Sequence, residues 1–249
     1  MKDIKISAAS MVGCVRENNE DMILVGDTFV RNGEYATGVH LTDKMRYLIA
    51  LCDGMGGHNS GEVASSDSLE NLHFFFNDIP SGLDASGFYE DIVEWLESIN
   101  NIIDSKGHVV PECKGMGTTL VAIAYFEGKL YSMNCGDSRM YRYRQGKLEQ
   151  QTTDHSLNNM MGSSEHNGII TNCIGGGCKN SFIDMVEMTE NVMAGDVYLL
   201  CSDGLTDMLK DGEIARLLAE GADATALCNA AVEAGGYDNV SVCLVEVLS

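Results

Sequence analysis

The sequence is poor in proline, in basic residues and in long apolar runs. Its 249 residues include only two prolines, and 16 Lys and Arg stand against 37 Asp and Glu, a formal net charge of −21. Such an acidic excess disfavours binding to nucleic acid or to an anionic membrane, because both reward basic patches. No apolar run approaches transmembrane length, and no Pro- or Ser-rich linker divides the chain. We therefore expect a single domain over residues 1–249.

The nine cysteines include no Cys-x-x-Cys pair, and several lie within apolar runs, as Cys52 and Cys243 do. This usage is typical of small buried hydrophobes in a reducing compartment. Cys173 and Cys178 could ligate zinc, but their spacing lacks a second pair. The first residues, MKDIK, contain no apolar signal-peptide core. These features predict a cytoplasmic protein.

The chain is organised around the stretch Asp53-Gly54-Met55-Gly56-Gly57, which follows the apolar run YLIALC and precedes a helical pattern. The glycines permit positive φ and expose backbone carbonyls. A carboxylate beside a bare carbonyl at a strand end suits a hard cation such as Mg²⁺ or Mn²⁺. An Asp-Gly pair is, by itself, more often only a turn.

Acidic turns of this kind recur along the chain. Asp203 and Asp137 each follow an apolar strand pattern, and Asp238 precedes the last one. Arg16 belongs to the polar stretch 16–21, whose arginine fork would match an oxyanion such as phosphate. If these strand ends meet in one sheet region, the sequence predicts a carboxylate-rich metal cluster.

The hydrophobic periodicity predicts a β-rich chain with paired helices. Strands are expected at residues 4–10, 22–25, 45–52, 120–126, 130–135, 140–144, 147–151, 182–188, 197–201 and 240–247. Helices are expected at residues 60–76, 88–103, 213–218 and 222–234. The polar segment 158–167 is expected to be a mobile loop, because it has too few apolar residues for a core of its own.

Seven motifs follow one another in a fixed order. They are Arg16-x-x-x-Glu20-Asp21, Asp53-Gly54-Met55-Gly56-Gly57, Gly115-x-Gly117-Thr118-Thr119, Asn134-Cys135-Gly136-Asp137-Ser138-Arg139, Asp154-His155-Ser156, Ser202-Asp203-Gly204 and Asp238-Asn239. Together they resemble the metal-dependent protein serine/threonine phosphatases of the 2C type, in their compact bacterial form. The resemblance extends from about Arg16 to Val247.

The resemblance implies an α+β fold, a four-layer αββα sandwich in which two antiparallel sheets are flanked by helices, with a dinuclear metal site at one end. It also implies an enzyme that hydrolyses phosphoserine and phosphothreonine in proteins with a metal-activated hydroxide. The implied cofactors are two Mn²⁺ or Mg²⁺ ions, with a third, weaker one. No covalent enzyme intermediate is needed, so the cysteines need not be nucleophiles.

Carried over by position, the resemblance assigns a role to each acidic turn. Asp53 would bridge two ions, the Gly54 carbonyl would bind one of them, and Asp203 and Asp238 would bind the other. With Arg16, the three aspartates form the implied catalytic set.

Four further residues, together with Arg16, complete the implied site. Glu20 and Asp21 would hold metal-bound waters, and Asp137 matches the aspartate of the third ion. Arg16 matches the arginine that binds the substrate phosphate. Asn239 would support the neighbouring aspartate.

The sequence departs from the family pattern in two places. Met55 stands where animal members carry a histidine proposed as general acid, and neighbouring His58 is a candidate for that role. The flap segment, about residues 156–172, is shorter than usual, which leaves substrate choice open.

The implied partners are phosphorylated proteins and a cognate serine/threonine kinase, with no nucleic acid and no membrane, and the protein is expected to be a monomer. Two alternatives stay open on the same scaffold: a small-molecule phosphatase and an inactive module that binds phosphoproteins. The complete set of carboxylates favours an active enzyme.

Overall fold

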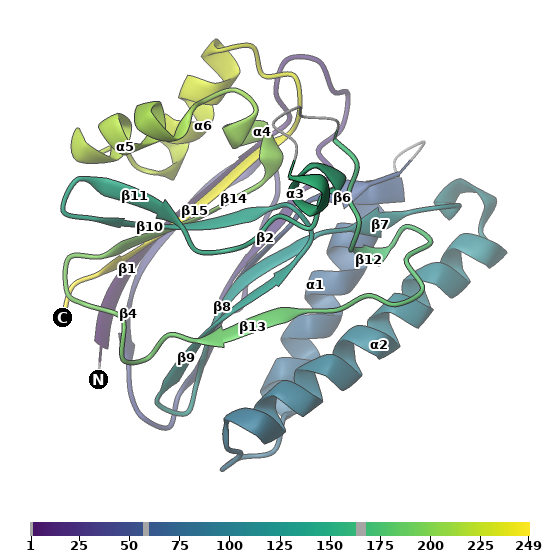
Figure 1. The fold of residues 1–249 in the computed structure, drawn as a ribbon, viewed down its shortest axis with the longest axis horizontal. Coiled ribbons are helices and arrows are strands. Elements are labelled where there is room, and N and C mark those ends of the chain that lie inside the picture. The colour runs from purple at the N-terminus through teal and green to yellow at the C-terminus, as the bar shows by residue number, and fades with distance from the viewer. Residues whose placement is uncertain (1, 57–59, 163–167) are drawn as a thin grey trace.

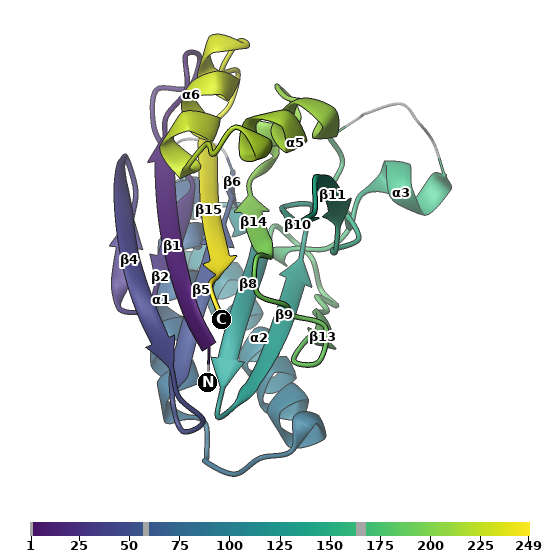
Figure 2. The same cartoon turned by 90° about the vertical axis from the view of Figure 1, so that its left-hand side faces the viewer.

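The computed structural model describes residues 2–56, 60–162 and 168–249, and these residues form four layers (Figures 1 and 2). Two six-stranded antiparallel sheets pack face to face, and helices cover the outer face of each. The αββα sandwich implied by the motifs is therefore confirmed. Among the described residues, no helix is both long and apolar enough to cross a membrane.

The first sheet has the strand order β11–β10–β14–β15–β1–β4. Its strands are β1 (Lys2–Met11), β4 (Gly33–Leu41), β10 (Arg139–Arg144), β11 (Lys147–Gln150), β14 (Val197–Cys201) and β15 (Val240–Val247). The second sheet has the order β13–β9–β8–β5–β2–β3. Its strands are β2 (Met22–Val25), β3 (Thr28–Val30), β5 (Arg46–Cys52), β8 (Leu120–Phe126), β9 (Lys129–Cys135) and β13 (Asp184–Glu187).

A small third sheet has the order β12–β7–β6 and lies at one end of the sandwich. Its strands are β6 (Gly54–Met55), β7 (Gly117–Thr118) and β12 (Ile174–Gly175). The helices are α1 (Ser60–Asp78), α2 (Ala85–Val109), α3 (Leu157–Met161), α4 (Asp203–Thr206), α5 (Asp211–Ala219) and α6 (Ala224–Glu233), with a 3₁₀ turn at Pro111–Cys113.

Three apolar clusters fill the spaces between the four layers. Trp95 and Phe76 belong to the cluster between the second sheet and helices α1 and α2. Ile6 and Leu51 belong to the cluster between the two sheets, and Leu227 to the one beneath α5 and α6. Because each sheet buries both faces, its central strands read as apolar runs, which is why the sequence marked them so clearly.

The sequence-based expectations fail at the least apolar elements. β4 was not predicted, because this edge strand alternates between exposed and half-buried residues and contains no apolar run. The two-residue strands of the third sheet are too short to show a period. The loop expected at 158–167 is wrong in its first part, which forms helix α3 between the capping residues Ser156 and Gly162. Residues 163–167 lie outside the described part of the chain.

Candidate metal centre

Two glycines allow the acidic turns to approach one another. A Cβ on Gly204 would lie 2.0 Å from the backbone oxygen of Asn239, so only glycine lets the Asp203 turn contact the Asp238–Asn239 turn. A Cβ on Gly54 would lie 2.5 Å from the backbone oxygen of Glu20. These close backbone approaches join the Asp203 turn to the Asp238 turn, and the Gly54 turn to the loop that carries Glu20.

Two threonines of the third motif hold the Asp53 turn in place. The Asp53 N–H donates to Thr119 Oγ1 (3.0 Å), and Thr118 Oγ1 donates to the Asp53 carbonyl (2.8 Å). Thr119 Oγ1 also shares a hydrogen bond of 2.7 Å with Ser138 Oγ, beside Asp137. In the sequence these threonines are only part of a motif; in the structure, Thr119 connects the Asp53 and Asp137 turns.

Asn239 connects the first motif to the last. Its Oδ1 accepts the Glu20 N–H (2.8 Å), and its Nδ2 donates to the carbonyls of Val12 and Asn18 (3.0 and 2.8 Å). Its own N–H donates to Asp238 Oδ1 (2.8 Å). Asn239 therefore contacts Asp238 through its backbone N–H, and its side chain fixes the loop that carries Glu20.

The carboxylates of these turns interact through space. Burial, followed by repulsion from Asp21, Asp203, Asp137 and Asp238, raises the pKa of Asp53 well above its ordinary value. These five acids therefore form one cluster of like charge.

Burial and nearby charges also act on three other members of the cluster. Burial and the neighbouring acids raise the pKa of Asp203 to about 8. Burial likewise raises the pKa of Asp21 and of Asp137 to about 6. At neutral pH these carboxylates repel one another when no cation is bound. A bound cation would therefore stabilise the cluster.

Asp21 has a buried carboxylate oxygen that a bound cation or water could satisfy. The residue is fully buried, and Ser202 Oγ donates to its Oδ2 (2.9 Å). Within residues 2–56, 60–162 and 168–249, its Oδ1 is buried without a hydrogen-bond partner. A buried acceptor left in this way is costly, and a cation or a water bound to one would satisfy it.

The donor set fits a hard divalent ion, because it consists of carboxylate and carbonyl oxygens. In the described part of the chain, no three His, Cys, Asp or Glu side chains converge tightly enough to form a ready-made cage. Mg²⁺ usually keeps several waters and takes only one or two carboxylates, so an ion of this kind does not require such a cage.

Arg16, the predicted phosphate ligand, lies at the rim of the cluster. Its Nη2 donates to Asp238 Oδ2 at 2.7 Å, and its side chain is 53% exposed. The hydrogen bond to Asp238 raises the pKa of Arg16. The guanidinium is thus near enough to the acids to meet an anion bound over them.

The structure describes one of the two histidines near the motif turns, His155, but not the other, His58. His155 is buried, and its Nδ1 accepts the Gly136 N–H (3.1 Å) while its Nε2 contacts Asp184 Oδ2 (3.1 Å). It therefore supports the turn before Asp137. His58, the candidate general acid, lies outside the described residues, as does Gly57.

With this geometry in view, comparison with known proteins defines the class. The family "Protein phosphatase 2C" matches residues 33–237, and the chain belongs to this family. It is 32% identical over 261 residues to the serine/threonine protein phosphatase PstP of Mycobacterium tuberculosis, covering 98% of the chain but 45% of PstP. It is 30% identical over 262 residues to the protein phosphatase PhpP of Streptococcus pneumoniae, covering 98% of both. The chain thus spans less than half of PstP and almost all of PhpP.

Solved structures agree with this assignment. The serine/threonine phosphatase of S. agalactiae superposes with a TM-score of 0.81 at 28% identity, covering 99% of this chain and all of that one. The catalytic domain of PstP in complex with two manganese ions gives a TM-score of 0.76 at 31% identity and covers both chains completely. The fold of the whole described chain is therefore that of bacterial phosphatases of this family.

Proposed function

We propose that this protein is a metal-dependent phosphatase that hydrolyses phosphoserine and phosphothreonine in proteins. The observation that carries the proposal is the cluster around Asp53, whose pKa is raised by burial and by four neighbouring acids, together with a buried oxygen of Asp21 that has no hydrogen-bond partner among the described residues. Membership of the protein phosphatase 2C family and the printed activities of PstP and PhpP support the reaction and the substrate class.

The roles proposed for the residues follow from their positions. Asp53, the Gly54 carbonyl, Asp203 and Asp238 would hold two Mn²⁺ or Mg²⁺ ions. When bound, such ions lower the pKa of water and supply hydroxide near neutral pH.

Three other acids would complete the site. Glu20 and Asp21 would orient water through their carboxylates, and Asp137 would hold a third, weaker ion. The Gly61 N–H already donates to the Glu20 carboxylate, which fixes the direction of that side chain. Thr118 and Thr119 keep the Asp53 backbone still while charge changes around it.

Arg16 would bind the phosphoryl oxygens of the substrate, because its guanidinium is exposed at the rim and lies beside the acids. Arg16→Ala should raise KM for a phosphopeptide by about tenfold and change kcat less, since a phosphate clamp already acts in the ground state. Arg16→Lys keeps the charge but loses the forked donor geometry, so its KM should lie between those of the wild type and Arg16→Ala. Unchanged KM together with weaker Mn²⁺ binding would instead make Arg16 a support for Asp238.

The function is tested by comparing hydrolysis of a phosphopeptide and of a nucleotide in Mn²⁺, Mg²⁺, Ca²⁺ and EDTA. We expect turnover of the phosphopeptide with Mn²⁺ or Mg²⁺ and none in EDTA. Preference for the nucleotide would favour a small-molecule phosphatase. Binding of the phosphopeptide without turnover in any metal would favour an inactive phosphoprotein-binding module.

The proposal extends to the setting of the enzyme. Phosphoserine and phosphothreonine in proteins arise from serine/threonine kinases, so a cognate kinase should oppose this phosphatase. We further propose a cytoplasmic monomer. In the part of the chain that the structure describes, helices pack on the outer face of each large sheet, which leaves less of these faces for a second subunit. Light scattering at several protein concentrations would test the monomer.

A further inference from the structure

Arg31, which follows strand β3, is a partly buried arginine that binds main-chain carbonyls as well as side chains. Its Nε donates to the Asp21 carbonyl (2.8 Å), and its Nη2 donates to the Glu62 carbonyl in the first turn of α1 (3.1 Å). Its Nη1 also lies 3.1 Å from Glu62 Oε1, and its side chain is 14% exposed. One guanidinium therefore joins the loop that carries Glu20 and Asp21 to the beginning of α1.

Ser65 extends this connection to Glu20. The fully buried hydroxyl of Ser65 accepts a hydrogen bond from Arg31 Nη2 (2.7 Å). It donates to the Glu20 carbonyl at 2.5 Å, which is closer than the Glu62 carbonyl at 3.2 Å. The carbonyls of the two adjacent acids are thus both held by Arg31, that of Asp21 directly and that of Glu20 through one hydroxyl.

The beginning of α1 also lies against the turn that carries the Gly54 carbonyl. A Cβ on Gly61 would lie 2.7 Å from the carbonyl carbon of Gly54 and 2.8 Å from the carboxylate carbon of Glu20. The Gly61 N–H donates to the same carboxylate. On the other side of the connection, the charge of Asp21 contributes to the raised pKa of Asp53. The segments that the guanidinium joins therefore both border the acidic cluster.

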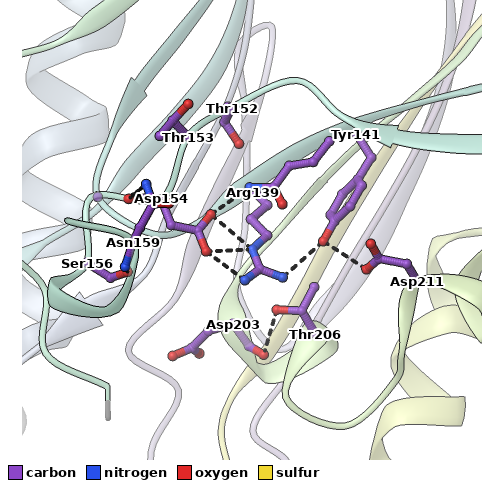
Figure 3. A network of polar contacts seen from close by, with 12 residues as sticks. Arg139, Tyr141, Thr152, Thr153, Asp154, Ser156, Asn159, Asp203, Thr206 and Asp211 are labelled. Atoms are coloured by element: carbon purple, nitrogen blue, oxygen red, sulfur yellow. Dashed lines mark hydrogen bonds and ion pairs between the residues drawn. The ribbon is translucent and has the colours of Figure 1, made fainter. Parts of the chain in front are cut away.

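Arg139, two residues after Asp137, is another partly buried arginine, but it makes a different kind of contact. Its Nε and Nη2 bind the Asp154 carboxylate (3.0 and 2.6 Å), and its Nη1 donates to the Tyr141 hydroxyl (3.0 Å), as Figure 3 shows. These partners are side chains. Arg31 instead holds the main chain of two segments, and a fixed main chain sets the direction in which the attached carboxylates point.

Arg46 is bound in almost the same way as Arg31, but at the other end of α1. Its Nη1 donates to the Asn77 carbonyl (2.9 Å), and its Nη2 donates to Ser81 Oγ (3.0 Å) and pairs with Glu127 (3.0 Å). The Arg46 side chain is 15% exposed. Removing either guanidinium therefore takes similar contacts from the same helix, and of the two only Arg31 borders the acidic cluster.

We propose that Arg31 is a positioning residue of the metal centre, which holds the main chain at Glu20 and Asp21 so that both carboxylates face the ion site. The reaction that these carboxylates serve rests on the proposed function. The positioning itself does not, because it concerns contacts within the chain and binding of the metal alone. Residues that orient metal-bound groups in this way contribute about tenfold to a hundredfold to metal affinity or activity.

The test compares Arg31→Gln, Arg31→Lys and Ser65→Ala with Arg46→Gln as the matched control. The first readout is hydrogen–deuterium exchange over residues 17–24 of the whole protein in EDTA. Arg31→Gln should speed exchange in this segment by about tenfold, because the loop loses its contact with α1. Arg46→Gln should match the wild type there, although it should lower Tm by about as much as Arg31→Gln does.

The second readout is the binding of Mn²⁺ without substrate, measured by isothermal calorimetry. Arg31→Gln should weaken Mn²⁺ binding by at least about tenfold, and Ser65→Ala, which keeps the bond to the Asp21 carbonyl, should weaken it less. Arg31→Lys should have an intermediate effect, because it keeps the charge but loses the forked donors. Arg46→Gln should bind Mn²⁺ as the wild type does.

The third readout is kcat and KM in saturating Mn²⁺ for a phosphopeptide and for p-nitrophenyl phosphate, which has no flanking chain. Arg31→Gln should lower kcat by at least about tenfold on both substrates. It should change KM by less than about twofold, because Arg16 is the proposed ligand of the phosphate. A merely structural role would give equal kcat values in Arg31→Gln and Arg46→Gln, because both lose similar contacts.

Two results would overturn the proposal. One is exchange over residues 17–24 and Mn²⁺ affinity that are the same in Arg31→Gln and Arg46→Gln. The other is an equal kcat for these two variants in saturating Mn²⁺. If Arg31→Gln does not fold, Arg31→Lys and Ser65→Ala carry the same comparison. If the wild type hydrolyses neither substrate, the proposed function fails, while exchange and Mn²⁺ binding still decide whether Arg31 positions the two acids.

Discussion

Strand β14 has an aspartate near each end, and the two carboxylates have opposite electrostatic surroundings. Asp196, before the strand, is buried, but two hydrogen bonds from Arg144 (2.5 and 2.6 Å) and one from the Met193 N–H (2.8 Å) surround its carboxylate. Burial alone would raise the pKa of Asp196, but these donors outweigh it, and the pKa lies below its ordinary value. At this end of β14, the Arg144 guanidinium neutralises the buried carboxylate.

Asp203, after the strand, meets other acids instead. Burial and repulsion from Asp137, Asp207 and Asp238 raise its pKa to about 8. The chain pairs Asp196 with its own arginine but surrounds Asp203 with other acids. This difference indicates that the Asp203 end of the strand is built to bind a cation. The contrast separates a structural aspartate from a proposed metal ligand, seven residues apart in sequence.

The largest difference is expected in catalysis. Asp203→Asn should lower kcat on a phosphopeptide by on the order of a thousandfold, because a lost ligand removes electrostatic stabilisation of the transition state. Asp196→Asn should retain kcat within about threefold once the protein is folded, since its partner Arg144 is remote from the reaction. Assays in saturating Mn²⁺ check both. A fully active Asp203→Asn protein would remove this residue from the site.

Stability of the metal-free protein should change in opposite directions. In EDTA at pH 8, Asp196→Asn should lower Tm by about 5 °C, because it leaves Arg144 without its partner. Asp203→Asn should raise Tm by a few degrees, because it removes one charge from a repelling cluster. Thermal unfolding followed by circular dichroism measures both. If the two substitutions shift Tm in the same direction, the contrast between the ends of β14 is wrong.

The same contrast predicts a smaller effect of pH. Asp21, Asp137 and Asp203 have pKa values of about 6, 6 and 8 in the folded protein, above the ordinary value. The folded state therefore binds more protons than the unfolded state between about pH 4 and 8, and the stability of the metal-free protein should fall as pH rises across that range.

Asp196 acts in the opposite sense. Its folded pKa lies below the ordinary value, so its stabilisation is present above about pH 4 and is lost only as pH falls through the folded pKa. Denaturant titrations in EDTA from pH 5 to 8 measure the slope. Saturating Mn²⁺ should flatten it, and Asp203→Asn should reduce it. A slope of opposite sign in EDTA would show that the acids are not destabilising.

These effects also show what could be predicted from the sequence. The strands that lead to Asp53 and Asp203 are apolar on both faces. The ends of these strands, and the acidic turns that follow, could therefore be predicted from the sequence. The motif order then gave the family and the αββα layers. Edge strand β4 gave no signal, because half of its residues face solvent.

The supports of the site were harder to see. Thr119, Ser138 and Ser202 are small polar residues whose importance depends on partners far away in sequence, such as the contact between Ser202 and Asp21. The pairing of Arg139 with Asp154 spans only 15 residues, yet nothing in the local pattern separates it from the pairing of a nearby arginine with Glu149. Such choices are made by tertiary packing, which a single sequence does not display.

Mn²⁺ binding to the metal-free protein tests the central claim most directly. Isothermal calorimetry would compare the wild type, Asp203→Asn and Asp196→Asn at pH 7.5, where the solution structure of each variant is first checked by circular dichroism. The account predicts about two ions for the wild type and for Asp196→Asn, and the loss of at least one of them in Asp203→Asn. Equal stoichiometry and affinity in all three proteins would contradict it.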